Sequence, residues 1–214
     1  MAKKKKKKIE KQANIIGIVL LSSIVLILLI AVAVGSTNKF KYLGVEFEKQ
    51  KYGDIVFYTG QIPLKNQYNA IVGYTEIDFR NDPRELKDIK LDLANDITFK
   101  RDWVTFLSVA PELEQCEDSG IAIINLGAIF LKNVNVPTTM GYMNKTQADK
   151  EGRDHATCAT YPLNTVIEVK SGQETAITST REGCYELTYK DCEVLDVVEK
   201  FQLEIIRQHV ESLI

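Results

Sequence analysis

The chain has 214 residues, of which 26% are charged and 45% hydrophobic, and its formal net charge at pH 7 is −2. This balance hides an asymmetry: seven of the 27 Lys and Arg residues, but only one of the 29 Asp and Glu residues, lie in residues 1–14. Residues 36–214 therefore hold 20 basic and 28 acidic side chains, a net charge of −8. A domain this acidic argues against nucleic acid as a partner, because phosphate backbones bind basic surfaces.

Residues 15–34 read IIGIVLLSSIVLILLIAVAV and contain no charge. As a helix they are about 30 Å long, which matches the hydrocarbon core of a bilayer. The basic tail of residues 1–14 predicts a cytoplasmic N-terminus and an extracellular domain at 36–214, because lysines stay inside. We therefore predict a single-pass protein of the cell membrane, with the lipid bilayer as one partner. A cleaved signal peptide is the alternative, since AVA at 31–33 fits a cleavage pattern, although signal peptides usually have only about 7–15 apolar residues.

Residues 36–110 are expected to be the β-rich part of the exported domain. Pro83 restricts the residue before it and lacks a donor, so a turn is expected at 80–84. We expect the strands to pair mostly antiparallel. Runs rich in β-branched and aromatic residues predict strands at 40–47, 54–64, 70–79, 89–93 and 97–109.

Residues 111–214 are expected to be an α/β part with two long helices. Pro and acidic residues at its start predict a helix over 111–132, and its apolar second half predicts burial. Asp191 is the expected N-cap of the last helix. Between the helices, 144–161 reads as a polar loop or a short surface helix. Strands are expected at 136–142, 165–169, 176–180 and 184–189. The predicted fold class is α+β on a single N-terminal transmembrane helix.

All four cysteines, Cys116, Cys158, Cys184 and Cys192, lie in the exported part. An even number in an oxidising compartment predicts two disulfides, and three pairings are open. We favour Cys184 with Cys192, which closes a short loop, and Cys116 with Cys158, which ties the central helix to the loop. Acidic neighbours and the lack of a CxxC motif disfavour a reactive thiol at Cys116 or Cys192.

His155 and Cys158 are the most suggestive residues for catalytic chemistry in the sequence. No GxSxG motif is present, a sortase-like histidine would lie further upstream of the cysteine, and the spacing is not that of a zinc site. We predict no catalytic residue, no metal site and no cofactor. An exported thiol-dependent or metal-assisted enzyme centred on these two residues is the alternative.

The favoured function is a non-enzymatic binding or assembly module, a subunit of an envelope complex with another envelope or surface protein as its partner. The candidate binding residues are Arg80, Asp82 and Arg84 in the turn and Asp154 and His155 in the loop, because loops on a rigid scaffold carry most recognition. The alternative for the turn is a local salt bridge with a structural role.

Asn144 begins an NKT sequon in the same polar loop and is a candidate glycosylation site.

Several stretches together resemble an uncharacterised group of small, single-span archaeal membrane proteins with four cysteines in the exported domain. The stretches are DFRNDPREL at 78–86, CEDS at 116–119, NKTQA at 144–148, NTVIEVK at 164–170 and GCYELTYKDCEVL at 183–195. They span most of the exported part. The resemblance implies an archaeal cell surface and paired cysteines, and it brings no assigned activity.

Overall fold

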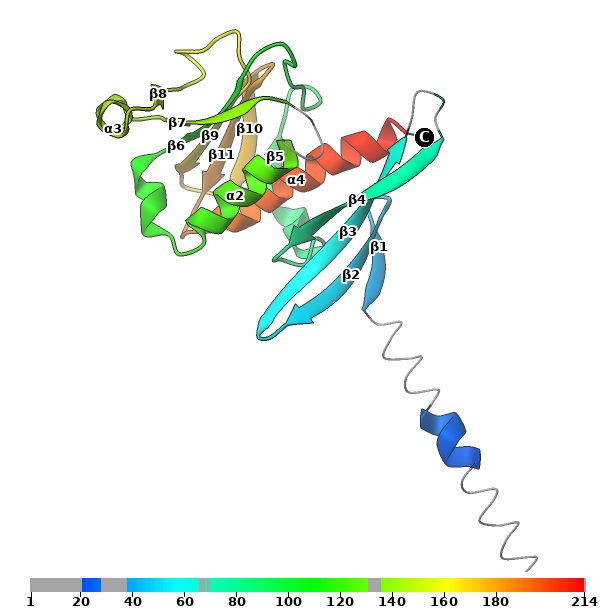
Figure 1. Cartoon of the computed structure of the whole chain (residues 1–214). Coiled ribbons are helices and arrows are strands. Elements are labelled where there is room, and N and C mark those ends of the chain that lie inside the picture. Colours follow the sequence, from blue (N-terminus) through cyan, green and yellow to red (C-terminus); the bar gives the residue numbers. More distant parts are fainter. Residues whose placement is uncertain (1–20, 28–37, 66–67, 69, 131–135, 214) are drawn as a thin grey trace, which may run out of the picture. The chain divides into compact units, whose positions relative to one another are not determined.

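The computed structural model describes residues 21–27, 38–65, 68, 70–130 and 136–213 (Figure 1). The chain divides into two compact units, 1–40 and 41–214. In the first unit, residues 21–27 are helical and their side chains are exposed. Most of the predicted span at 15–34 lies outside the described residues. Within the described residues, no helix has both the length and the apolar character needed to cross a membrane.

The first sheet is the antiparallel one that the sequence predicts. Its strands follow in the order β1 (Lys39–Tyr42), β2 (Val45–Tyr52), β3 (Ile55–Lys65) and β4 (Ile71–Phe79). Alternate residues such as Phe47, Ile62 and Phe79 are buried on one face. Gly60 is required there, because a Cβ atom would lie 2.7 Å from the Phe47 ring. The order leaves β4 at one edge of the sheet.

The second sheet is mixed and has the order β5-β10-β11-β9-β6-β7-β8. Among its described strand pairs, β10 and β11 are antiparallel and the others are parallel. The antiparallel region therefore ends at Phe79, and β5 and β6 depart from the prediction because they pair in parallel here. The chain passes from β6 to β7 through a helical segment, and such a crossover makes β6 and β7 parallel. The bounds are β5 (Lys90–Asp92), β6 (Thr105–Val109), β7 (Thr138–Tyr142), β8 (Asp154–His155), β9 (Val166–Ser171), β10 (Ala176–Arg181) and β11 (Cys184–Tyr189).

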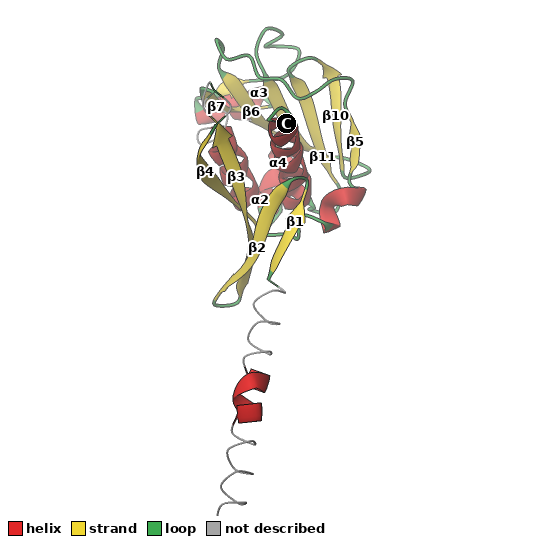
Figure 2. Cartoon of the chain, turned by 90° about the vertical axis from the view of Figure 1, so that its right-hand side faces the viewer, coloured by secondary structure: helices red, strands yellow, loops and turns green. Residues whose placement is uncertain are grey.

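Two helices, α2 (Ser119–Ile129) and α4 (Val194–Glu211), lie between the two sheets (Figures 1 and 2). Helix α4 contacts α2, β10 and β11, and also β3 and the short 3-10 helix η1 (Glu85–Asp88). Because sheets lie on two sides of it, α4 is buried over most of its circumference. The Phe201 and Tyr185 rings lie 5.5 Å apart, and a Cβ at Gly44 would lie 2.7 Å from Val210 Cγ1.

Local differences from the prediction have backbone causes. The helix expected at 111–132 begins as a 3-10 turn, η2 (Pro111–Gln115), and breaks at Cys116, whose backbone is extended. Asp191 is not the N-cap of α4, because it has φ 47° and Glu193 occupies the cap position. The polar region 144–161 contains the short helix α3 (Lys145–Glu151), one of the two forms expected, followed by β8. The mixed α+β class is confirmed.

Candidate functional site

The turn with Arg80, Asp82 and Arg84 is anchored rather than free. Asp82 is 9% exposed, and its carboxylate accepts hydrogen bonds from the Arg84 backbone N–H at 3.0 Å and from Nε at 2.9 Å. This contact with Arg84 lowers the pKa of Asp82. The Arg80 guanidinium lies over the Phe57 ring at 5.4 Å. The side chains proposed for recognition are thus brought together, but by contacts within the turn and with the neighbouring sheet.

Glu199 of α4 holds the same turn in place through hydrogen bonds to its backbone. Its carboxylate is fully buried and accepts the backbone N–H of Arg80 at 2.6 Å and of Asn81 at 3.0 Å. The Asn81 side chain also donates to Asp196, one turn earlier in α4. Burial raises the pKa of Glu199 to about 7, although the two N–H donors favour the ionised form. A buried carboxyl that holds a turn is a structural device, and sequence reasoning missed it.

The loop that carries Asp154 and His155 is also held on several sides. His155 Nε2 donates to the Met143 carbonyl oxygen at 3.0 Å. The Tyr161 hydroxyl donates to Asp154 at 3.0 Å, and this bond raises the pKa of Tyr161. Arg181 of β10 donates to the Cys158 and Tyr161 carbonyl oxygens at 2.9 and 3.2 Å. The candidate residues Asp154 and His155 therefore lie in a braced segment.

Asn144 has a defined structural role at the start of α3. Its side-chain oxygen accepts the backbone N–H of Gln147 at 3.1 Å, so it is the N-cap of that helix. The residue is exposed.

The disulfide pairing differs from the predicted one. Cys116 bonds with Cys192, and Cys158 bonds with Cys184. The first bond joins the end of η2 to the segment just before α4, where Cys192 has φ 63°. The second bond ties the 156–164 segment to β11, beside a small core of Phe106, Ala156 and Val166. The expected number of disulfides is confirmed, whereas the expected partners are wrong.

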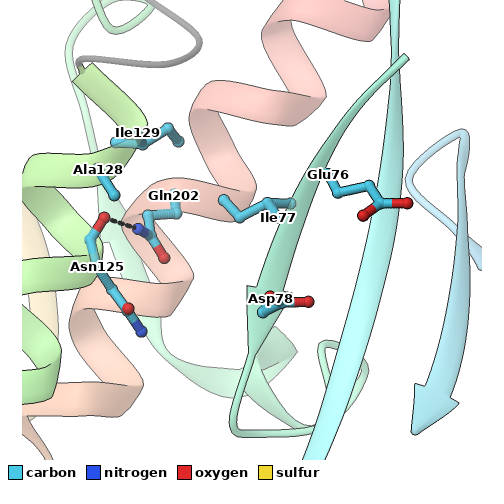
Figure 3. A pocket seen from close by; sticks show the side chains of 7 residues that line it. All are labelled: Glu76, Ile77, Asp78, Asn125, Ala128, Ile129 and Gln202. Carbon is cyan, nitrogen blue, oxygen red and sulfur yellow. Dashed lines mark hydrogen bonds between the residues drawn. The ribbon is translucent and has the colours of Figure 1, made fainter.

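A groove that the sequence did not predict lies between β4 and the two helices (Figure 3). Its volume is about 110 Å³. Ile77 points from β4 towards Gln202 of α4, while Glu76 and Asp78 point to the other side of the strand (Figure 3). The remaining lining residues, Asn125, Ala128 and Ile129, come from α2.

One polar atom in this groove has no partner. Gln202 is 1% exposed; its Nε2 donates to the Asn125 carbonyl oxygen at 2.7 Å, and its Oε1 accepts no hydrogen bond within the described structure. A buried acceptor left unpaired is unfavourable by about 1–3 kcal/mol. The groove therefore offers an acceptor to an incoming donor.

Exposed apolar side chains lie on two of the elements that line the groove, α2 and β4. On α2, Ile124 is 71% exposed and Ile121 is also exposed. On β4, Val72 is 64% and Tyr74 59% exposed. Large exposed apolar side chains on neighbouring elements are candidates for burial by a partner. The sequence predicts that this apolar helix is buried, and that prediction is wrong at Ile121 and Ile124, which α2 exposes to solvent.

A second cavity of about 260 Å³ continues along α4 beneath β3 and shares Ile129 with the groove. Its lining is mostly apolar and includes Ile62, Leu64 and Phe99. His209 at its margin has its Nε2 3.2 Å from the Pro63 carbonyl oxygen.

Comparison of the chain with protein-family models, with curated proteins and with solved structures found no match.

Proposed function

We propose that this protein is a membrane-anchored extracytoplasmic binding or assembly module, a subunit of a cell-envelope or surface complex. The observation that carries the proposal is the surface formed by the β4 edge, the groove beside it and the exposed face of α2, hereafter the β4–α2 surface. It combines apolar side chains at Val72 and Tyr74, on the outward face of β4, and at Ile124 on α2 with an unpaired acceptor on Gln202 in the groove. Exposed apolar area next to a preformed pocket is what a partner can bury.

The location part of the proposal rests on separate observations. The lysine tail and the uncharged run at 15–34 are typical of a single-pass anchor with the domain outside. Two disulfides suit an oxidising compartment. The resemblance to archaeal surface proteins agrees with this setting. Asn144 is exposed and caps α3 through its oxygen, so a glycan on its nitrogen is compatible with the fold.

The enzyme alternative receives less support. The sulfur of Cys158 is bonded to Cys184, so it is not a free nucleophile in this state. His155 uses Nε2 to bind the Met143 carbonyl oxygen. Across the described ranges, no three His, Cys, Asp or Glu side chains are grouped closely enough to hold a metal ion.

The test compares two substitutions of exposed apolar residues. Ile124→Glu places a charge on the β4–α2 surface, and Leu163→Glu places the same charge at a 60% exposed position outside it. Neither should change the free energy of unfolding by more than about 0.5 kcal/mol, because both sites are exposed. On native gels of detergent-solubilised membranes from the producing organism, we expect the wild type and Leu163→Glu to migrate as a complex. Ile124→Glu should migrate as the free chain, because burying a charge opposes association.

The proposal is wrong if all three proteins migrate at the position of the purified full chain. It is equally wrong if both substitutions dissociate the complex to the same extent, since the effect would then be one of charge and not of this surface.

A further inference from the structure

We infer that the partner supplies an extended strand that adds antiparallel to β4 and carries two basic residues followed by apolar ones. This inference rests on the proposed function and names the class of partner for the same surface. The strand order places β4 at the edge of the antiparallel sheet, where eight of its nine residues pair with β3 and with no other strand of the described sheet. In the described part of the chain, no further backbone hydrogen bond reaches β4 on its other side. Such an edge is a template for strand addition.

The outward side chains of β4 determine which strand fits. Val72, Tyr74, Glu76 and Asp78 alternate onto the solvent face, so two apolar positions are followed by two acidic ones. Opposite-charge and apolar pairs stabilise neighbouring antiparallel strands, and like charges destabilise them. An antiparallel partner read from its N-terminus therefore meets the acids first. Its outward residues should be basic, basic, apolar and apolar.

The inward residues of the added strand face the groove. The residue opposite Ile77 lies between the two basic positions and points towards the 110 Å³ space that Gln202 lines. A cavity of about 150 Å³ accepts benzene, so this space suits a small side chain. A threonine or serine would fill it and donate its hydroxyl to Gln202 Oε1, which is the buried acceptor without a partner.

A second copy of the chain fits this edge less well. Antiparallel pairing of β4 with itself about Thr75 places Glu76 opposite Tyr74 and Asp78 opposite Val72. Pairing centred on Ile77 places Glu76 opposite Asp78, which sets like charges against each other. Neither register brings a basic side chain to the acids, so charge complementarity favours a basic strand from another protein.

The experiment uses the amidated heptapeptide KTKVYSV, labelled with a fluorophore, and the full chain in detergent micelles at 0.15 M salt. Its outward residues are Lys, Lys, Tyr and Val. We expect saturable binding by fluorescence anisotropy, weakened at least ten-fold by Glu76→Lys. The matched control is Glu46→Lys, because Glu46 lies in the same cross-strand row through Gln61 but two strands from the edge. That distance is about 10 Å, beyond the screening length of about 8 Å, so binding should change less than two-fold.

Three further peptides test the strand geometry and the pairing of basic with acidic residues. The peptide ETEVYSV should bind Glu76→Lys at least ten-fold more tightly than the wild type. Two forms of KTKVYSV, methylated on alternate sets of backbone nitrogens, should differ by at least ten-fold, because an added strand presents only every second N–H to β4.

Equal binding of the two methylated forms would overturn strand addition. Equal losses of affinity with Glu46→Lys and Glu76→Lys would overturn the pairing of basic residues with the acidic residues of β4. Absence of binding, or self-association of the chain that Glu76→Lys abolishes, would overturn the partner class. If these fail while Ile124→Glu alone dissociates the native complex, the proposed function stands and only this partner class is wrong.

Discussion

Removal of the Cys116–Cys192 disulfide by Cys116→Ala with Cys192→Ala is expected to lower the free energy of unfolding by about 4.5 kcal/mol. The bond closes a loop with a sequence separation of 76, and the chain-entropy model assigns this stabilisation to restriction of the unfolded chain. The matched control, Cys158→Ala with Cys184→Ala, opens a separation of 26 and should lose about 3.5 kcal/mol. Urea unfolding of the full chain in detergent, followed by circular dichroism, measures both.

Peptide mapping without reduction provides the direct check on the pairing. The structure requires one fragment that joins Cys116 to Cys192 and another that joins Cys158 to Cys184. A fragment that joins Cys184 to Cys192 would contradict it. If neither double substitution changed the urea midpoint, the disulfides would not stabilise the fold.

Replacement of Glu199 by Ala is expected to lower the free energy of unfolding by about 3 kcal/mol at pH 5. The substitution leaves the backbone N–H groups of Arg80 and Asn81 without their acceptor, each at about 1–3 kcal/mol. Glu199→Gln is the matched control, because it keeps the volume and one acceptor oxygen. Its loss should be smaller than that of Ala.

The same residue gives the stability a pH dependence of known sign. The pKa of Glu199 is about 7 in the folded protein, against an ordinary value of 4.5, so between these pH values the folded state holds a proton that the unfolded state has released. The contribution of Glu199 to the free energy of unfolding should therefore fall by about 3 kcal/mol as the pH rises from 4.5 to 7. Glu199→Gln lacks this fall, whereas Asp196 remains in both proteins.

Urea titrations at pH 4.5, 6 and 7.5 give the difference in the free energy of unfolding between the wild type and Glu199→Gln. The contributions of the other titrating groups largely cancel in this difference. A difference that stays constant, or grows in favour of the wild type as the pH rises, would contradict the assignment of a raised pKa to this carboxyl.

The strands and the last helix were predictable from local pattern. Residues 54–64 and 70–79 match β3 and β4 closely, because their β-branched and aromatic residues have strong strand preference. Helix α4 follows the spacing of its apolar residues. Pro83 lies in the turn that follows β4, where the sequence predicts a turn.

Long-range pairing was not predictable from the same pattern. The choice of Cys184 with Cys192 followed sequence proximity, but β11 lies between these residues and separates their ends. Cys192 reaches Cys116 instead, through a left-handed backbone at Asp191 and Cys192. Asp adopts this conformation occasionally, but Cys does not favour it, so the sequence did not indicate the turn. Strands β5 and β6 each pair in parallel with strands that come later in the chain. Such pairing depends on the path of the connecting segments, which strand propensity does not encode.

The candidate site was missed because its signals were weak ones. Glu199 and Gln202 lie on the same helical stripe as Leu195 and Ile206, and polar residues within an apolar stripe indicate buried polar groups. The β4–α2 surface needed the sheet order, since a strand's sequence alone does not tell whether it lies at an edge.

Site-specific photo-cross-linking in intact cells tests most directly the claim that this domain binds a partner through the β4–α2 surface. A photoreactive amino acid replaces Ile124, Val72 or, as the control outside this surface, Leu163, all of them exposed apolar positions. The account predicts a discrete product between the chain and another envelope protein from positions 124 and 72, and none from 163. No product from 124 and 72, a product equal in yield from 163, or only a product of twice the mass of the chain would contradict it.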